Sequence, residues 1–241
     1  MTNFTYEDVA KMIDHSLLNP TLSVKDLEAG IQLALAYDVA SVCILPYYMK
    51  RCAELLSGST VKASTTIGFP HGGHTTAIKR AEAEQAVADG CQELDMVVNI
   101  SKVLSGDWDY VRQDIGAVIE VAHAAGQKVK VIFENCYLND EQKTRLCEIC
   151  TELNVDWVKT STGYGSGGAT PEDLKLMREK SGANVQVKAA GGVRELDALL
   201  AVRELGVSRC GASRTSEILN EARQRLGLSP INVAASGNAG Y

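Results

Sequence analysis

The sequence lacks any apolar run long enough to span a lipid bilayer, and its first residues show no basic segment followed by an apolar stretch. We therefore expect no transmembrane helix and no secretory signal. A basic excess is absent too, because the formal net charge of the 241 residues is −6 at pH 7. This charge argues against a broad surface for nucleic acid or an anionic membrane, whereas a small anionic substrate needs only a local site.

A second cysteine pair at zinc-site spacing is also missing. The seven cysteines are scattered, and only Cys147 and Cys150 form a C-x-x-C pair, inside a segment with a helical pattern. We interpret all seven as reduced thiols of a cytoplasmic protein, and Cys147 and Cys150 as residues on a helix face. The four histidines include no helical ligand pair, so we expect no metal and no cofactor, and a metal-dependent barrel enzyme is the weakest alternative.

Short β-branched runs alternate with longer amphipathic segments along the chain. The runs predict strands at 12–17, 39–45, 61–67, 93–98, 128–134, 155–161, 185–190 and 207–212. Helical patterns lie between them, for example at 75–89 and 107–125, which is typical of parallel strands joined by crossover helices. Eight such units predict an α/β fold, a (β/α)8 TIM barrel, and a doubly wound open sheet is the alternative. We expect a single barrel domain at 1–228 and a polar tail at 229–241.

Three ionisable residues interrupt predicted strands that are otherwise apolar: Asp95, Lys159 and Lys188. Side chains alternate across a strand, so Lys159 faces the barrel interior if Val158 faces the helices, and Lys188 follows the same rule with Val187. Asp95 turns inward by the same argument. Catalytic residues of this fold come from the C-terminal ends of the strands, where the two lysines lie on neighbouring strands.

Two neighbouring lysines have a chemical consequence. One ammonium group about 5 Å from another, at an effective dielectric of about 20, costs roughly 3 kcal/mol, or about two pKa units. Partial loss of water lowers a lysine pKa further. One lysine would then hold a neutral amine that attacks a carbonyl to form an imine, and Asp95 would move the proton directly or through water. The alternative is a buried lysine–aspartate network that only stabilises the barrel.

Glycine-bearing loops follow the last three predicted strands. Gly163 follows the sixth strand, Gly191 and Gly192 follow the seventh, and Gly211 and Ser213 end the eighth. The loops after strands 7 and 8 are the usual phosphate position of this fold, where backbone N–H groups bind the anion. The loops therefore predict a phosphate site, and simple turns are the alternative.

The motifs in and between these strands resemble those of the deoxyribose-phosphate aldolases, the DeoC family of class I aldolases. The resemblance runs from IDHSLLNP at 13–20 to GAS at 211–213, with TIGFPHG, ELDMVVNI, KVIFENC, VKTSTG, GGATPEDLKLM and VKAAGGVR in the expected order. It implies a cytoplasmic lyase of deoxyribose phosphate catabolism that needs no metal. The implied reaction is the reversible cleavage of 2-deoxy-D-ribose 5-phosphate to acetaldehyde and D-glyceraldehyde 3-phosphate.

The resemblance also implies roles for individual residues. Lys159 matches the Schiff-base lysine of the K-T-S-T-G motif, Lys188 matches the second lysine that perturbs it, and Asp95 matches a proton donor and acceptor. Five positions match the family's phosphate loops: Gly163, Gly191, Gly192, Gly211 and Ser213.

Further residues match positions that support the family's site: Asp14, Cys43 and Thr162. A capping aspartate is the structural alternative for Asp14, and a small core residue is the alternative for Cys43. We hypothesise that Tyr241, at the end of the tail, folds over the barrel mouth and touches substrate.

Other residues depart from the common pattern of the family: Leu45, His74 and Arg214. The guanidinium of Arg214 would either join the phosphate site or lie on the surface. We interpret Lys130 and Glu134, which share one face of the fifth predicted strand, as a structural pair inside the barrel.

The expected partners are the phosphorylated sugar and acetaldehyde, without nucleic acid or membrane, and a homodimer is left open as the assembly. Two other functions also stay open. One is a class I aldolase for a different phosphorylated sugar. The other is a non-catalytic barrel that binds phosphosugars, although a binder has no need for an activated amine.

Overall fold

The computed structural model describes residues 4–233. This part of the chain forms a closed barrel of parallel strands in sequence order, with β8 hydrogen-bonded to β1. The strands are β1 (Ile13–Leu17), β2 (Ser41–Ile44), β3 (Lys62–Ile67), β4 (Glu93–Val97), β5 (Lys128–Ile132), β6 (Trp157–Lys159), β7 (Gln186–Ala190) and β8 (Val207–Ala212). All strand ends lie within two residues of the predicted bounds, so the TIM barrel is confirmed and the open sheet is wrong.

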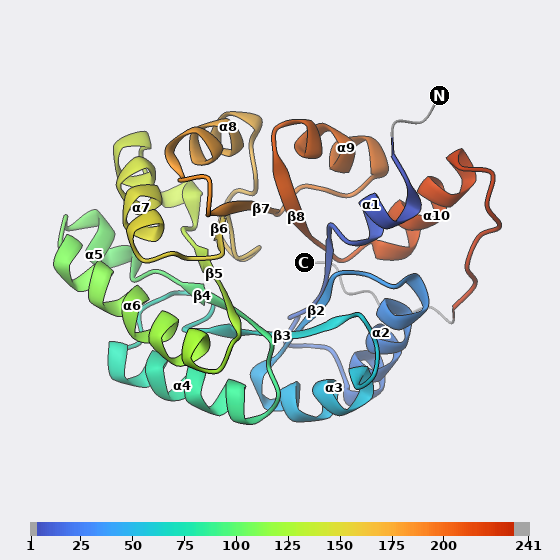
Figure 1. Ribbon diagram of the computed structural model, residues 1–241, viewed down its shortest axis with the longest axis horizontal. Coiled ribbons are helices and arrows are strands. Elements are labelled where there is room, and N and C mark those ends of the chain that lie inside the picture. Colours follow the sequence, from blue (N-terminus) through green and yellow to red (C-terminus); the bar gives the residue numbers. More distant parts are fainter. Residues whose placement is uncertain (1–3, 234–241) are drawn as a thin grey trace.

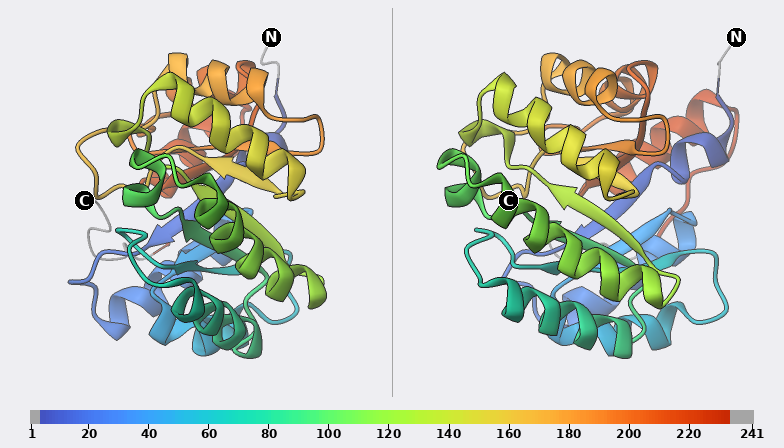
Figure 2. Two further views of the ribbon diagram at one scale, coloured as in Figure 1. Left: turned by 90° about the vertical axis from the view of Figure 1, so that its left-hand side faces the viewer. Right: turned by 60° about the vertical axis from the view of Figure 1, so that its left-hand side comes forward.

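Helices follow the strands and surround the barrel as a ring (Figure 1). They are α1 (Tyr6–Ala10), α2 (Val24–Tyr37), α3 (Met49–Leu56), α4 (Thr76–Ala88), α5 (Ile100–Leu104), α6 (Trp108–Ala124), α7 (Asp140–Glu152), α8 (Pro171–Lys180), α9 (Leu196–Glu204) and α10 (Thr215–Arg225), with the 3-10 helices η1 (Pro46–Tyr48) and η2 (Asn135–Tyr137). The side views show the strands running through the middle of the molecule with helices on either side (Figure 2). The predicted helical segments 75–89 and 107–125 are confirmed as α4 and α6.

Polar residues determine where several of these helices begin. Ser23 accepts a hydrogen bond from the backbone N–H of Asp26, whose carboxylate bonds back to the Ser23 backbone N–H in a capping box. Thr170 caps α8 in a similar way through the N–H of Asp173, and Pro171 occupies the first helical position. These caps end each strand-to-helix loop at a defined residue, so the loops return the chain to the ring of helices.

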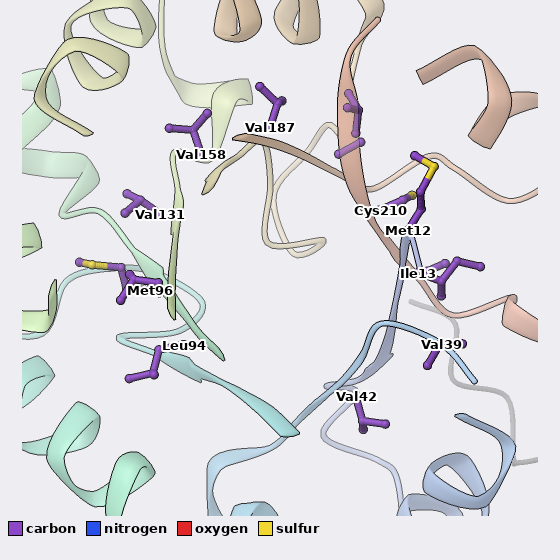
Figure 3. Packing of buried hydrophobic residues seen from close by; sticks show 14 of the residues in the cluster. Met12, Ile13, Val39, Val42, Leu94, Met96, Val131, Val158, Val187 and Cys210 are labelled. Carbon is purple, nitrogen blue, oxygen red and sulfur yellow. The ribbon is translucent and has the colours of Figure 1, made fainter. Parts of the chain in front are cut away.

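The outward faces of the strands are apolar and pack against the helices. Leu94, Met96, Val131, Val158 and Val187 are fully buried, and their side chains point away from the barrel axis (Figure 3). Burying one such side chain contributes roughly 1.5–3 kcal/mol, so this layer supplies much of the stability of the fold. Because side chains alternate along a strand, the residues between them turn into the barrel.

The inward faces of the strands are polar, whereas branched apolar side chains usually fill the interior of this fold. The buried polar residues that face the interior are Asp14, Ser41, Ser64, Thr66, Glu93, Asp95, Lys130, Lys159 and Lys188. Small hydroxyl side chains come from β2 and β3, and most of the charged ones come from β4 to β7. The barrel core is therefore built from groups that can carry out chemistry.

The C-x-x-C pair lies on a helix, as predicted. Cys147 and Cys150 are buried on α7, and both are free thiols. No helix within residues 4–233 has the length and apolar character needed to cross a membrane.

The residues after α10 lie back against the barrel. The hydroxyl of Tyr37 donates a hydrogen bond to the carbonyl of Ile231 at 2.8 Å, and the side chain of Asn220 bonds to both backbone groups of Ile231. The tail predicted from residue 229 thus begins with a segment held against α2 and α10, and its last residues, 234–241, lie outside the described range.

A buried ion pair joins α4 to α6 outside the barrel. Nζ of Lys79 lies 2.5 Å from Oδ2 of Asp114, and both side chains are almost wholly buried. The same Nζ donates a hydrogen bond to the carbonyl of Val97 at 2.9 Å, and the Thr76 hydroxyl donates one to Oδ1 of Asp114. The pair therefore fixes two helices to the end of β4, the strand that carries Asp95.

We expect Asp114→Ala to destabilise the protein strongly, because it leaves the Lys79 ammonium buried without its carboxylate. Removing one partner of a buried ion pair costs about 3–5 kcal/mol. Urea unfolding followed by circular dichroism measures this loss. Glu84→Ala, which removes an exposed partner of Arg80, is the matched control and should change stability little. Equal losses in the two variants would contradict the structural importance of the Lys79–Asp114 pair.

Candidate active site

The carboxylate of Asp95 binds three lysines from the strands that follow it. Its Oδ2 accepts hydrogen bonds from Nζ of Lys159 and Nζ of Lys188, both at 2.8 Å, and its Oδ1 accepts one from Nζ of Lys130, also at 2.8 Å. Strand register explains the arrangement, because Asp95 lies beside Lys130, and Lys159 lies beside Lys188. The structure thus brings together the three residues for which the sequence predicts catalysis.

Asp14 joins the cluster from β1. Its Oδ2 lies 2.5 Å from Nζ of Lys188 and 3.5 Å from Nζ of Lys130, so the alternative of a capping aspartate is wrong. Burial alone would raise the pKa of Asp14, but the cations of Lys130, Lys188 and Arg209 outweigh burial and hold this pKa well below its usual value. The same competition lowers the pKa of Asp95. Both groups are therefore carboxylates at neutral pH.

The pKa values of Lys159 and Lys188 are shifted in opposite directions although the two lysines share one carboxylate. Burial lowers the pKa of Lys159 below its ordinary value; the Asp95 carboxylate opposes this shift and the Lys188 cation adds to it. Burial also acts against the charge of Lys188, but Asp14 and Asp95 outweigh it and raise the pKa of that lysine. Of the two lysines, Lys159 is thus the one that gives up its proton more readily, and Lys188 holds its proton more firmly. Burial lowers the pKa of Lys159 more than the Lys188 cation does, whereas the sequence analysis gave that cation as the first cause.

A cavity of about 690 Å³ lies at the C-terminal ends of β1, β2, β6, β7 and β8. Both lysines reach it, whereas Asp95 is fully buried behind them. Ten of the residues that the sequence predicts for the site line this cavity: Asp14, Cys43, Lys159, Thr162, Gly163, Lys188, Gly191, Gly192, Gly211 and Ser213.

The positions that the sequence left ambiguous divide into two groups. Cys43 is buried yet lines the cavity, and burial raises the pKa of its thiol to about 11, so it is uncharged at neutral pH. Arg214 also lines the cavity. His74 and Leu45 are not among the lining residues of this part of the chain, and Nδ1 of His74 lies 3.1 Å from Oε1 of Glu82 instead.

Glycine-bearing backbone forms the side of the cavity nearest β7 and β8. Gly191 and Gly192 have φ values of 78° and 94°, in the left-handed region that glycine adopts without strain. A Cβ atom at Gly191 would lie 2.9 Å from Cα of Gly168, so the loops after β6 and β7 pack backbone against backbone. Arg194 and Ser213 line the same cavity. Backbone N–H groups, a hydroxyl and a guanidinium are suitable partners for a phosphate group.

Known proteins match this chain along most of its length. The model of the DeoC/LacD family aldolases matches residues 8–214. The chain belongs to this family of aldolases. A deoxyribose-phosphate aldolase of Rhodopirellula baltica is 72% identical over 241 residues, which is 100% of both chains. One of Thermococcus gammatolerans is 46% identical and covers 90% of this chain and 97% of its own.

Solved structures agree with this family. An aldolase named QR15 superposes with a TM-score of 0.86 at 36% identity and covers 91% of this chain and 97% of its own. A deoxyribose phosphate aldolase from Aeropyrum pernix, described as a unique tetramer, superposes with a TM-score of 0.84 at 28% identity over 92% and 93% of the two chains.

Sequence reasoning missed two charged residues of this aldolase. Glu93 and Arg209 face the barrel interior, where Oε1 of Glu93 lies 2.8 Å from Nη2 of Arg209. The alternation of side chains along a strand predicts this orientation. Glu93 stands two residues before Asp95 and Arg209 stands two residues before Gly211, so each lies on the inward face of its strand. Tyr241 lies outside the described residues, so its contact with substrate stays a prediction.

The interpretation of Lys130 and Glu134 as a pair is wrong. Nζ of Lys130 lies 2.6 Å from Oε2 of Glu93 and 2.8 Å from Oδ1 of Asp95. Strand β5 ends at Ile132, and Glu134 has a left-handed backbone with φ 56°, so the alternation of the strand does not extend to it. Its carboxylate accepts hydrogen bonds from the backbone N–H and the hydroxyl of Thr162, and so fixes the loop after β6.

We expect Glu134→Gln to lower the kcat/KM of the aldolase by roughly ten- to hundredfold, because a displacement of about 1 Å near the chemistry can cost this much. The amide has only one acceptor oxygen for the two donors of Thr162, in a loop that begins directly after Lys159. Steady-state kinetics measures the effect, and Glu141→Gln, on the exposed start of α7, is the control. Equal activity of both variants would show that Glu134 does not position the loop.

Proposed function

We propose that this chain is a class I deoxyribose-phosphate aldolase that reversibly cleaves 2-deoxy-D-ribose 5-phosphate to acetaldehyde and D-glyceraldehyde 3-phosphate. The observation that carries the proposal is Lys159, a lysine with a lowered pKa that lies 2.8 Å from a buried carboxylate and reaches the cavity. The names of the Rhodopirellula and Thermococcus relatives supply the substrate.

The reaction begins with the neutral amine of Lys159. Its nitrogen attacks the aldehyde carbon C1 of the open-chain sugar, and loss of water gives a protonated imine. The hydroxyl on C3 then loses its proton, the C2–C3 bond breaks, and its electron pair moves into the imine to form an enamine. D-Glyceraldehyde 3-phosphate leaves, C2 of the enamine takes up a proton, and hydrolysis frees acetaldehyde and the amine.

The protons of these steps are transferred by Lys188 and Asp95, and Asp14 helps to keep Lys188 protonated. Lys188 keeps its proton at neutral pH because two carboxylates raise its pKa, so it is a proton donor that shares the Asp95 carboxylate with Lys159. Asp95 lies 2.8 Å from the nitrogens of both lysines and passes the proton between them. Its lowered pKa makes it an acceptor in the resting enzyme.

The 5-phosphate binds at the glycine-bearing side of the cavity. We assign it to the backbone of Gly163, Gly191, Gly192 and Gly211 and to the hydroxyl of Ser213, with Thr162 as a support for the loop. The positive φ of Gly163, Gly191 and Gly192 supports this role, since loops of such residues present backbone N–H groups to an anion.

We further propose that the enzyme works in the cytoplasm. Six of the seven cysteines are buried, and all seven are free thiols within residues 4–233, which suits a reducing compartment. The homodimer stays a prediction, and the Aeropyrum pernix relative is described as a tetramer.

Trapping with acetaldehyde and borohydride tests the nucleophile. We expect a reduced two-carbon adduct on Lys159, located by peptide mass spectrometry, because of the two lysines that line the cavity only this one has a lowered pKa. Lys159→Leu should lose the adduct, and Lys175→Leu, on the exposed face of α8, should keep it. An adduct on another lysine, or none, would sink the proposal and favour a phosphosugar-binding barrel. An adduct without cleavage of 2-deoxyribose 5-phosphate would indicate an aldolase for another sugar.

Ser213→Asp tests the phosphate site. A carboxylate about 5 Å from the phosphate should lower kcat/KM for 2-deoxyribose 5-phosphate by roughly a hundredfold. The kcat/KM for unphosphorylated 2-deoxyribose should stay unchanged, because no second anion is present. Ser101→Asp, exposed on α5, is the control. Equal losses for both sugars would place the phosphate elsewhere.

A further inference from the structure

The charged groups of the barrel interior form one connected network. Arg209, on β8, bonds to Oδ1 of Asp14 with one nitrogen and lies 2.8 Å from Oε1 of Glu93 with another. Oε2 of Glu93 lies 2.6 Å from Nζ of Lys130, which in turn contacts Asp95. The network thus extends from Lys159 at the cavity to Arg209, which does not line the cavity.

One end of the network is closed by an aromatic ring. The guanidinium of Arg209 lies 5.0 Å from the ring centroid of Trp157, and Nζ of Lys130 lies 5.7 Å from it. Trp157 is 4% exposed, and its indole nitrogen donates a hydrogen bond to Ser208. Water is therefore scarce around these charges, and each unbalanced charge acts over a longer range than it would at the surface.

Counting charges singles out Lys159. The network holds three carboxylates, Asp14, Glu93 and Asp95, and three cations besides Lys159, which are Lys130, Lys188 and Arg209. These six charges sum to zero, so a proton on Lys159 would leave one uncompensated positive charge in a buried site, which is unfavourable. Among residues 4–233, Lys159 also contacts one carboxylate, whereas Lys130 contacts three and Lys188 contacts two.

Within residues 4–233, the other titratable groups around Lys159 form no ion pair with these six groups. Cys43, from β2, keeps its proton because burial raises the pKa of its thiol to about 11. Strand β3 contributes the uncharged Ser64 and Thr66. Glu134 is bonded to Thr162, and His15 faces α10, where it contacts the hydroxyl of Thr215. Glu217, Arg194 and Arg214 line the cavity.

We propose that Arg209 and Glu93 are positioning residues that determine whether Lys159 carries a proton, through the charge balance of this network. The proposal rests on the proposed role of Lys159 as nucleophile. Neither residue lines the cavity, so neither contacts substrate. The directions of the pKa shifts agree with it: the pKa is raised for Lys130, Lys188 and Arg209 and lowered for Lys159.

Removing a cation and removing a carboxylate from the network should shift the pKa of Lys159 in opposite directions. Arg209→Met leaves the network with one excess negative charge, so Lys159 binds a proton more readily and its pKa rises. Glu93→Gln leaves one excess positive charge, so this pKa falls. The double variant Arg209→Met/Glu93→Gln has two carboxylates and two cations besides Lys159 and is balanced again. A charge about 10 Å away, at an effective dielectric of about 20, shifts a pKa by about one pH unit.

The pKa of Lys159 is measured directly on the full-length chain. Acetic anhydride labels neutral amines, and peptide mass spectrometry gives the labelled fraction of Lys159 at each pH. We expect a midpoint about one pH unit higher in Arg209→Met, about one unit lower in Glu93→Gln, and close to the unsubstituted protein in the double variant. The acid limb of the pH profile of kcat/KM should move with the midpoint, since attack needs the neutral amine.

Two further variants separate charge from packing. Arg209→Lys keeps the cation and should keep the midpoint. If Arg209→Met fails to fold, Arg209→Gln, which is also uncharged, takes its place and should raise the midpoint in the same way. Arg225→Met removes a cation of α10 that pairs with Asp197 and Glu221 at the surface and should leave the midpoint unchanged.

The proposal is overturned if both single variants move the midpoint the same way, if neither moves it, or if the double variant does not return it. The labelling needs no catalysis, so its outcome is distinct from that of the proposed function. If the labelling midpoints shift as expected but 2-deoxyribose 5-phosphate is not cleaved, the proposed function is wrong and the proposed charge balance is supported.

Discussion

The carboxylate of Asp95 accepts hydrogen bonds from three lysines inside the barrel, and much of the site depends on this arrangement. Three ammonium groups cannot share one anion as full charges without further compensation. Asp14 and Glu93 supply it for Lys130, and Asp14 supplies it for Lys188. Lys159 is the lysine left with a single, shared partner. The proposed reactivity of Lys159 therefore rests on the other cations of the interior, which already occupy most of the carboxylates.

This interior contributes little to stability by itself, because a buried ion pair is often no more stabilising than apolar residues of the same volume. The fold is held instead by the apolar layer between strands and helices, which contains Leu94, Met96, Val158 and Val187. The two faces of each strand thus serve different purposes. The outer face stabilises the barrel, and the inner face can carry buried charges that would be unfavourable in a smaller core.

Sequence reasoning predicted the fold well because local patterns determine it. Strand ends agreed within two residues, and the alternation around Val158 and Val187 placed both lysines correctly. Sequence reasoning failed where a contact depends on the conformation of a loop or on which strands are neighbours in the closed barrel. Glu134 lies two residues beyond the end of β5, in a left-handed conformation that no strand pattern predicts. The partners of Lys130 come from β1 and β4, and only the closed register of the barrel brings them together.

The same limit applies to the protonation of Lys159. Sequence analysis explained the neutral amine by one neighbouring cation, whereas the structure makes burial the larger cause and surrounds that cation with carboxylates. In a site with little water, a charge interacts with several others at once, so its effect cannot be assigned to one pair. Lys188 lowers the pKa of Lys159 only to the extent that Asp14 and Asp95 leave it uncompensated. The lowered pKa of Lys159 is thus a property of the barrel interior as a whole, and Lys188 acts on it as one member of that network.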